Sequence, residues 1–170
     1  MPDCRYSPES TYAPEVVMKS LALTSRGAFL FAAVFLLIAT VVAIAAETPT
    51  SLAGVTVVDA AKAKSLMDGG AVMVDARVAN EYAESHIKGA KSVPYKEKSV
   101  KAVSYNPAED SFDVAKLPSD KNAALVFACN GAECWKSYKA AAAAVKSGYK
   151  KVYWFRDGLP GWKSKGYPVE

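Results

Sequence analysis

Histidine is almost absent from this chain, because His86 is the only one in 170 residues. A single histidine excludes metal sites that need several histidines. It also excludes a Ser-His-Asp hydrolase site built away from His86, and most Cys-His proteases. Cysteine is also scarce: the chain has Cys4, Cys129 and Cys134. The C-x4-C spacing of the last two is neither the C-x-x-C redox motif nor a zinc pair, and no C-x-x-C-H haem motif exists. We therefore expect no metal and no cofactor.

Strong charge of one sign is also lacking, since the net charge is +4. The densest positive group is Lys96, Lys98 and Lys101, and the other lysines are scattered. A nucleic-acid-binding surface needs clustered basic residues. We therefore expect no nucleic-acid partner, and we interpret these lysines as a solvated basic surface.

One long apolar run is present, over residues 27–46, and it contains no charged residue. Lys19 and Arg26 precede it, and Ala43 and Ala45 fit the −3 and −1 positions of a signal-peptidase site. The pattern predicts a secretory signal that is cleaved after Ala45. The run is also long enough to span a bilayer, so an uncleaved membrane anchor is the alternative.

In both cases the positive charges lie before the apolar run, which places the following domain outside the cytoplasm. We expect three parts along the chain: an extension and signal over residues 1–45, a linker over 46–53 and one domain over 54–170. The domain is expected to be periplasmic or exported, with a membrane contact only if the signal is uncleaved. Met18 is an alternative start.

Short apolar runs alternate with helical patterns throughout the domain. The predicted strands are residues 55–58, 71–74, 92–94, 125–127 and 151–155, and the predicted helices are 60–67, 78–85 and 135–147, with a last helical turn near 158–162. Residues 95–122 are polar and irregular. This alternation favours an α/β fold with a parallel sheet covered on both faces. Ligands of such sheets bind beyond the carboxyl ends of the strands.

Cys129 lies at one such end, because it follows the apolar run 123–128 and opens a polar loop over 130–134. The next helix is predicted to begin near Trp135. A thiol in this place meets unpaired backbone N–H groups and the positive end of the helix dipole. This setting stabilises an anion on sulfur and suits a nucleophilic thiolate or a persulfide. The alternative is an inert, buried cysteine.

Three segments together resemble the rhodanese family of sulfurtransferases. The first runs from Val74-Asp75-Ala76-Arg77 through Glu81 and His86-Ile87-Lys88-Gly89-Ala90 to Pro94, the second is the Cys129 loop, and the third is 152–162, VYWFRDGLPGW. The resemblance implies a rhodanese-like α/β domain with a central, mainly parallel five-stranded sheet and helices on both faces. It also implies that His86 has a packing and hydrogen-bonding role.

The activity implied is that of a thiosulfate sulfurtransferase-like enzyme. Cys129 would take sulfane sulfur from a small anionic donor such as thiosulfate, become a persulfide, and pass the sulfur to cyanide or a thiol. The residues expected to bind the substrate are Asn130, Gly131, Ala132, Glu133, Cys134, Trp135, Lys136 and Arg77. For Arg77, an ion pair with Asp75 that supports the loop is the alternative.

The loop departs from the family pattern at Cys134, where many active sulfurtransferases have an arginine. The first cation after Cys129 is Lys136, and Glu133 adds a negative charge that opposes a dianionic donor. Cys134 has three alternative roles: it forms a disulfide with Cys129, it resolves a persulfide, or it only packs.

Two other functions are therefore kept beside the sulfurtransferase. One is a periplasmic thiol or persulfide relay that uses Cys129 and Cys134 with a protein thiol partner. The other is a non-catalytic, partner-binding rhodanese-like module, although the presence of Cys129 argues against it.

Overall fold

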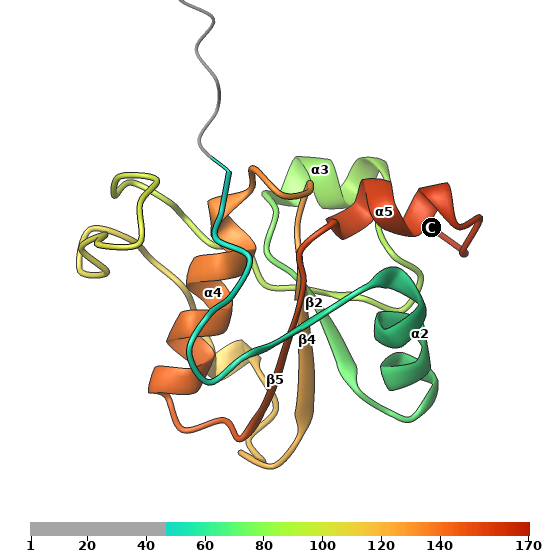
Figure 1. The fold of residues 1–170 in the computed structure, drawn as a ribbon, viewed down its shortest axis with the longest axis horizontal. Coiled ribbons are helices and arrows are strands. Elements are labelled where there is room, and N and C mark those ends of the chain that lie inside the picture. Colours follow the sequence, from blue (N-terminus) through green and yellow to red (C-terminus); the bar gives the residue numbers. More distant parts are fainter. Residues whose placement is uncertain (1–46) are drawn as a thin grey trace, which may run out of the picture. The chain divides into compact units, whose positions relative to one another are not determined.

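The computed structural model describes residues 47–170 (Figure 1). The predicted leader, its cleavage site after Ala45, the alternative start Met18 and the third cysteine, Cys4, lie outside the described residues. Within residues 47–170, no helix combines the length and the apolar character that crossing a membrane requires.

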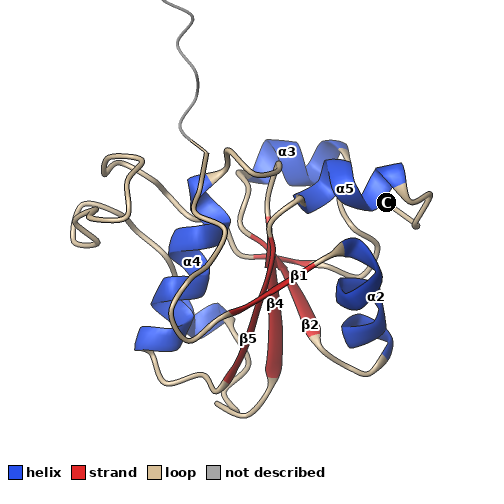
Figure 2. Ribbon diagram, viewed as in Figure 1, coloured by secondary structure: helices blue, strands red, loops and turns tan. Residues whose placement is uncertain are grey.

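The centre of the domain is a five-stranded sheet in the order β1-β5-β4-β2-β3, and every pair of neighbouring strands is parallel (Figure 2). Its strands are β1 (Thr56–Val58), β2 (Val72–Asp75), β3 (Lys91–Ser92), β4 (Ala124–Ala128) and β5 (Lys151–Phe155). This confirms the predicted α/β class. The sheet was predicted to be mainly parallel, and all four strand pairs are parallel.

Helices cover both faces of the sheet, as predicted. They are α2 (Ala60–Asp68), α3 (Ala79–Glu84), α4 (Trp135–Lys146) and α5 (Gly158–Ser164), with one 3-10 turn, η1 (Val114–Lys116). Figure 1 shows α4 on one side of the sheet and α2 on the other, with α3 and α5 along one end. The Asp59 side chain accepts a hydrogen bond from the Lys62 backbone N–H at 2.8 Å and so caps the N-terminus of α2.

The two faces of β4 divide the core into two layers, because successive strand side chains point to opposite sides. Leu125 and Phe127 pack with the alanines of α4, Ala140, Ala141 and Ala144, all of which are fully buried. Val126 and Ala128 pack on the other side with residues of α2 and α5. The small side chains of α4 allow the helix to lie close to the sheet.

A buried ion cluster fixes the irregular segment between β3 and β4 onto α4. The Lys139 side chain of α4 is fully buried, and its Nζ lies 2.8 Å from Glu97 Oε1 and 3.6 Å from Asp110 Oδ2. The same ammonium donates hydrogen bonds to Ser99 Oγ at 2.9 Å and to the Val100 carbonyl at 3.0 Å. Lys139 therefore holds residues 96–101, which we call the strap, against the helix.

Asp110 holds the strap from its other side. It accepts hydrogen bonds from the backbone N–H groups of Lys98 and Ser99 and from the hydroxyls of Ser99 and Tyr95. Burial alone would raise the pKa of Asp110, but these hydrogen bonds outweigh it and hold the pKa well below its usual range. Asp110 is therefore ionised at neutral pH and available to Lys139.

We expect Lys139→Met to lower the free energy of unfolding by about 3–5 kcal/mol, because the buried carboxylates lose their counter-charge. Urea unfolding, followed by circular dichroism, measures this change. The matched control is Lys146→Met, at an exposed position on the same helix, for which we expect about 0.5 kcal/mol or less. Equal effects of the two substitutions would contradict the role given to the cluster.

Candidate active site around the Cys129 loop

The register of the sheet brings three strand ends together. Asp75 at the end of β2 pairs with Ala128 of β4, and Ala128 pairs with Phe155 at the end of β5. The loop that follows β4 therefore lies between the segments that follow β2 and β5. The segment after β2 begins with Ala76-Arg77, directly after Asp75. The segment after β5 begins with Arg156-Asp157-Gly158.

Cys129 and Cys134 are joined by a disulfide, with a Cα–Cα distance of 6.1 Å. The bond connects the residue after β4 to the residue that immediately precedes α4, so it closes the loop on itself. The two cysteines differ in burial: Cys129 is 2% exposed, whereas Cys134 is half-buried. The disulfide, one of three alternatives from the sequence, is thus present, and the predicted resolving role remains a prediction.

The N-terminal end of α5 presses against the start of this loop. The Leu159 N–H donates a hydrogen bond of 2.9 Å to the Cys129 carbonyl. Gly158 has a φ of +57°, and a Cβ at this position would overlap the Cys129 carbonyl oxygen and lie 2.8 Å from the Gly131 nitrogen. Only glycine satisfies both the backbone conformation and this close approach.

The other side of the loop is held by Thr48. Its N–H and its hydroxyl both donate to the Ala132 carbonyl, the former at 2.9 Å. Arg156, which follows β5, fixes Thr48 by donating to its carbonyl at 2.7 Å and to its hydroxyl at 3.2 Å. Thr48 is 2% exposed, so residues predicted as a linker contribute to the support of the loop.

A third support comes from α3. The Asn130 side-chain amide donates a hydrogen bond of 2.6 Å to Glu81 Oε1. The other carboxylate oxygen of Glu81 accepts from the Val78 N–H, which precedes α3. The first residue of the polar loop is therefore attached to a helix that follows β2.

Arg77 and Asp75 form a buried ion pair. Arg77 Nη2 lies 2.6 Å from Asp75 Oδ2, and Arg77 Nε lies 3.0 Å from both carboxylate oxygens. The guanidinium also donates to the Ser85 carbonyl at 2.8 Å, and both side chains are almost fully buried. The ion pair with Asp75, the alternative from the sequence, is thus present, whereas its support of the loop remains a prediction. Arg77 does not line the pocket described below.

His86 lies in a separate cluster near the C-terminus. Its ring stacks on Tyr82 with a centroid separation of 3.7 Å, and its Nδ1 lies 2.8 Å from the Tyr82 carbonyl. Its Nε2 lies 3.4 Å from Glu170 Oε1. These contacts account for a packing and hydrogen-bonding role.

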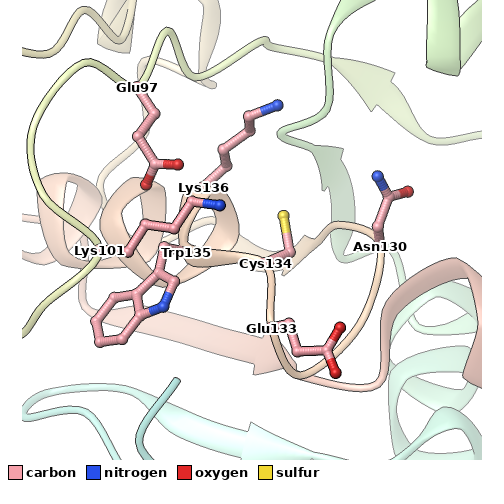
Figure 3. A pocket seen from close by; sticks show the side chains of 7 residues that line it. All are labelled: Glu97, Lys101, Asn130, Glu133, Cys134, Trp135 and Lys136. Atoms are coloured by element: carbon pink, nitrogen blue, oxygen red, sulfur yellow. The ribbon is translucent and has the colours of Figure 1, made fainter. Parts of the chain in front are cut away.

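A cavity of about 230 Å³ opens beside the loop (Figure 3). It is lined by Glu97, Lys101, Asn130, Glu133, Cys134, Trp135 and Lys136. Five of these were predicted from the sequence as substrate-binding residues. Gly131 and Ala132 lie in the loop but do not line the cavity, and neither does the buried Cys129.

Sequence reasoning missed Glu97 and Lys101, which the strap brings to the cavity. In Figure 3 the ammonium end of Lys101 points from the strap toward the side of Cys134. The only sequence signal was the group Lys96, Lys98 and Lys101, which we interpreted as solvated surface. That interpretation is incomplete for Lys101, because it also lines the cavity.

No group of three or more His, Cys, Asp or Glu side chains in residues 47–170 is arranged to hold a metal ion. The chemistry of the site therefore has to be argued from the two sulfur atoms, the lysines and the backbone of the loop.

A parallel α/β domain with a cysteine loop between β4 and α4 is the arrangement that the resemblance in the sequence implied. The model of the rhodanese-like domain matches residues 59–165, and the chain belongs to this family. A comparison with curated proteins found no match.

Solved structures agree with this family. The thiosulfate sulfurtransferase from Pseudomonas aeruginosa is 25% identical, with a TM-score of 0.51 over 68% of this chain, which spans only 20% of that protein. A rhodanese-like domain from Anabaena sp. is 26% identical, with a TM-score of 0.50, covering 66% of this chain and 76% of that one.

The polysulfide-sulfur transferase homodimer from Wolinella succinogenes is 18% identical, with a TM-score of 0.51, covering 69% of this chain and 80% of that one. At this identity the likeness concerns the fold alone. Together the comparisons place the domain among rhodanese and sulfurtransferase-like structures.

We expect Gly158→Ala to destabilise the domain and to alter the reactivity of Cys129, because the new Cβ displaces the Cys129 carbonyl. The matched control is Gly166→Ala, where φ is +67° but no atom lies within 4 Å of the position that a Cβ would take. The control should lose about 1–2 kcal/mol from backbone strain alone, and Gly158→Ala about 1–3 kcal/mol more. Thermal unfolding and the alkylation rate of the reduced protein test this, and equal losses would contradict it.

Proposed function

We propose that this protein is an exported sulfurtransferase in which reduced Cys129 carries the sulfur. The observation that carries the proposal is the position of Cys129 at the end of β4, followed by a closed loop and the start of α4, in a rhodanese-like domain. The similarity to a thiosulfate sulfurtransferase at 25% identity supports thiosulfate as a donor.

The reaction divides into two displacements. The Cys129 thiolate attacks the outer sulfur of thiosulfate, the S–S bond of thiosulfate breaks, and sulfite leaves with the electron pair. Cyanide or a thiolate then attacks the outer sulfur of the Cys129 persulfide, giving thiocyanate or a new persulfide and regenerating the Cys129 thiolate. Both steps need the Cys129–Cys134 disulfide to be reduced first.

The backbone and the cavity contribute to these steps in different ways. Peptide N–H groups at the start of α4 favour negative charge on the persulfide without a histidine base. Lys101 and Lys136 offer positive charge to an anionic donor, although as point charges and not as the fork of an arginine. Exposed Glu133 partly offsets this attraction for a dianion such as thiosulfate.

The disulfide favours a second candidate function, a thiol or persulfide relay. In this relay Cys129 and Cys134 alternate between the dithiol and the disulfide, and a protein thiol is the partner. The two candidates are distinguished by Cys134→Ser, which leaves transfer to cyanide intact but abolishes a relay that cycles through the disulfide.

We expect Cys129→Ser to abolish sulfur transfer while the domain stays folded, because it removes the sulfur that would carry the persulfide. The measurement is intact mass spectrometry of the reduced protein after thiosulfate. Wild type and the matched control Cys134→Ser should gain one sulfur atom that cyanide removes. Thiocyanate production by Cys129→Ser at a rate near that of wild type would reject the assignment.

Export has its own test. Expression of the full chain in a Gram-negative host, followed by fractionation and N-terminal mass mapping, should give a periplasmic protein that begins at Ala46. A membrane-bound protein with an intact N-terminus would support the anchor instead. Retention of the domain in the cytoplasm would reject both.

A further inference from the structure

The two sulfur atoms of the disulfide are not equally accessible. Cys129 is 2% exposed and does not line the cavity, whereas Cys134 is half-buried and forms part of the cavity wall. A nucleophile that opens a disulfide attacks one sulfur directly, and access decides which. In the oxidised protein the sulfur available from the cavity is that of Cys134.

The cavity also has the charge to attract an anion to this sulfur. Lys136 lies in the first turn of α4, and Lys101 reaches the same space from the strap. Lys101 is held there because Lys139 binds the carbonyl of its neighbour Val100 and the hydroxyl of Ser99. The strap is thus a fixed wall of the cavity.

Two carboxylates also line the cavity, but they are not equivalent. Glu97 Oε1 lies 2.8 Å from the buried Lys139 ammonium, which offsets its charge. Glu133 is exposed to solvent, where water screens its charge, and Lys101 is exposed as well, so the half-buried Lys136 supplies the less screened positive charge. The space between Lys101, Lys136 and Cys134 is therefore favourable for a singly charged nucleophile.

We propose that, in the oxidised protein, Cys134 Sγ is the electrophilic sulfur and that an anionic sulfur nucleophile, a thiolate or hydrosulfide, attacks it from this cavity. A bond forms between the nucleophile and Cys134 as the Cys134–Cys129 bond breaks, and the electron pair leaves on Cys129 as a thiolate. With hydrosulfide the products are a Cys134 persulfide and the Cys129 thiolate. The sulfide loses the two electrons that the disulfide gains, so no other oxidant is needed.

The leaving group fits this direction of attack. Cys129 Sγ is bonded to Cys134, the residue that precedes α4, so it lies near the N-terminal end of that helix, where the helix dipole stabilises a thiolate. A better-stabilised thiolate leaves faster. The proposal gives Cys134 a role distinct from resolving a Cys129 persulfide, and it does not depend on whether the reduced protein transfers sulfur from thiosulfate.

The first test maps the site of attack. The purified full chain, with its disulfide formed under mild oxidation, is exposed briefly to 2-mercaptoethanesulfonate, quenched with excess N-ethylmaleimide, and cleaved after Glu133 to separate the two cysteines. We expect the mercaptoethanesulfonate adduct on Cys134 and the maleimide on Cys129. The reverse assignment, an equal mixture, or two free thiols after the mild oxidation would overturn the proposal.

The second test asks whether Lys101 selects for negative charge. The opening rate is measured with 2-mercaptoethanesulfonate and with 2-mercaptoethanol, whose side chain is neutral, and the ratio of the two rates is compared. We expect Lys101→Gln to lower this ratio roughly threefold or more, since one nearby charge is lost.

The matched control is Lys98→Gln, which removes the same charge from an exposed strap residue that does not line the cavity. It should leave the ratio unchanged. Equal effects of the two variants, or no effect of either, would overturn the assignment of Lys101. Because these measurements follow disulfide opening alone, their outcome is independent of the thiosulfate assay.

Discussion

The parallel register of β2, β4 and β5 is the constraint on which the site depends. Because Asp75, Ala128 and Phe155 are paired across the sheet, the three following segments have to meet at one edge. A slip of one residue in β4 would exchange its two faces and move Leu125 and Phe127 away from the alanines of α4. Core packing therefore fixes the register, and the register places Cys129 between the Asp75–Arg77 pair and Gly158.

The sequence was sufficient for the elements whose signals are local. The last strand has the predicted bounds, 151–155, and α4 begins at Trp135, where it was expected. It was not sufficient for contacts between distant segments. Lys139 lies in an alanine-rich helix, and nothing near it in the sequence indicates that it is buried. Asp110, in the irregular segment before β4, supplies a counter-charge for the buried ammonium group. Lys101 was missed for the same reason, since the strap is placed by that cluster.

The two reactions proposed for the loop differ in the sulfur atom that reacts. In the reduced state the proposed nucleophile is Cys129, which lies at the end of a buried strand. In the oxidised state the sulfur that borders the cavity is that of Cys134. Lys101 and Lys136 line the cavity beside Cys134, and the reacting partner is an anion in both proposals.

The Thr48 contact shows that the folded unit extends beyond the residues that the family model matches. The family match begins at residue 59, yet two donors on Thr48 bind the carbonyl of Ala132, inside the ring that the disulfide closes. A fusion or shortened chain cut at the family boundary would keep both cysteines and most of the sheet. It would nevertheless leave one side of the ring open and Arg156 without its Thr48 partner. Residues that support a site can therefore lie outside the segment that relatives share.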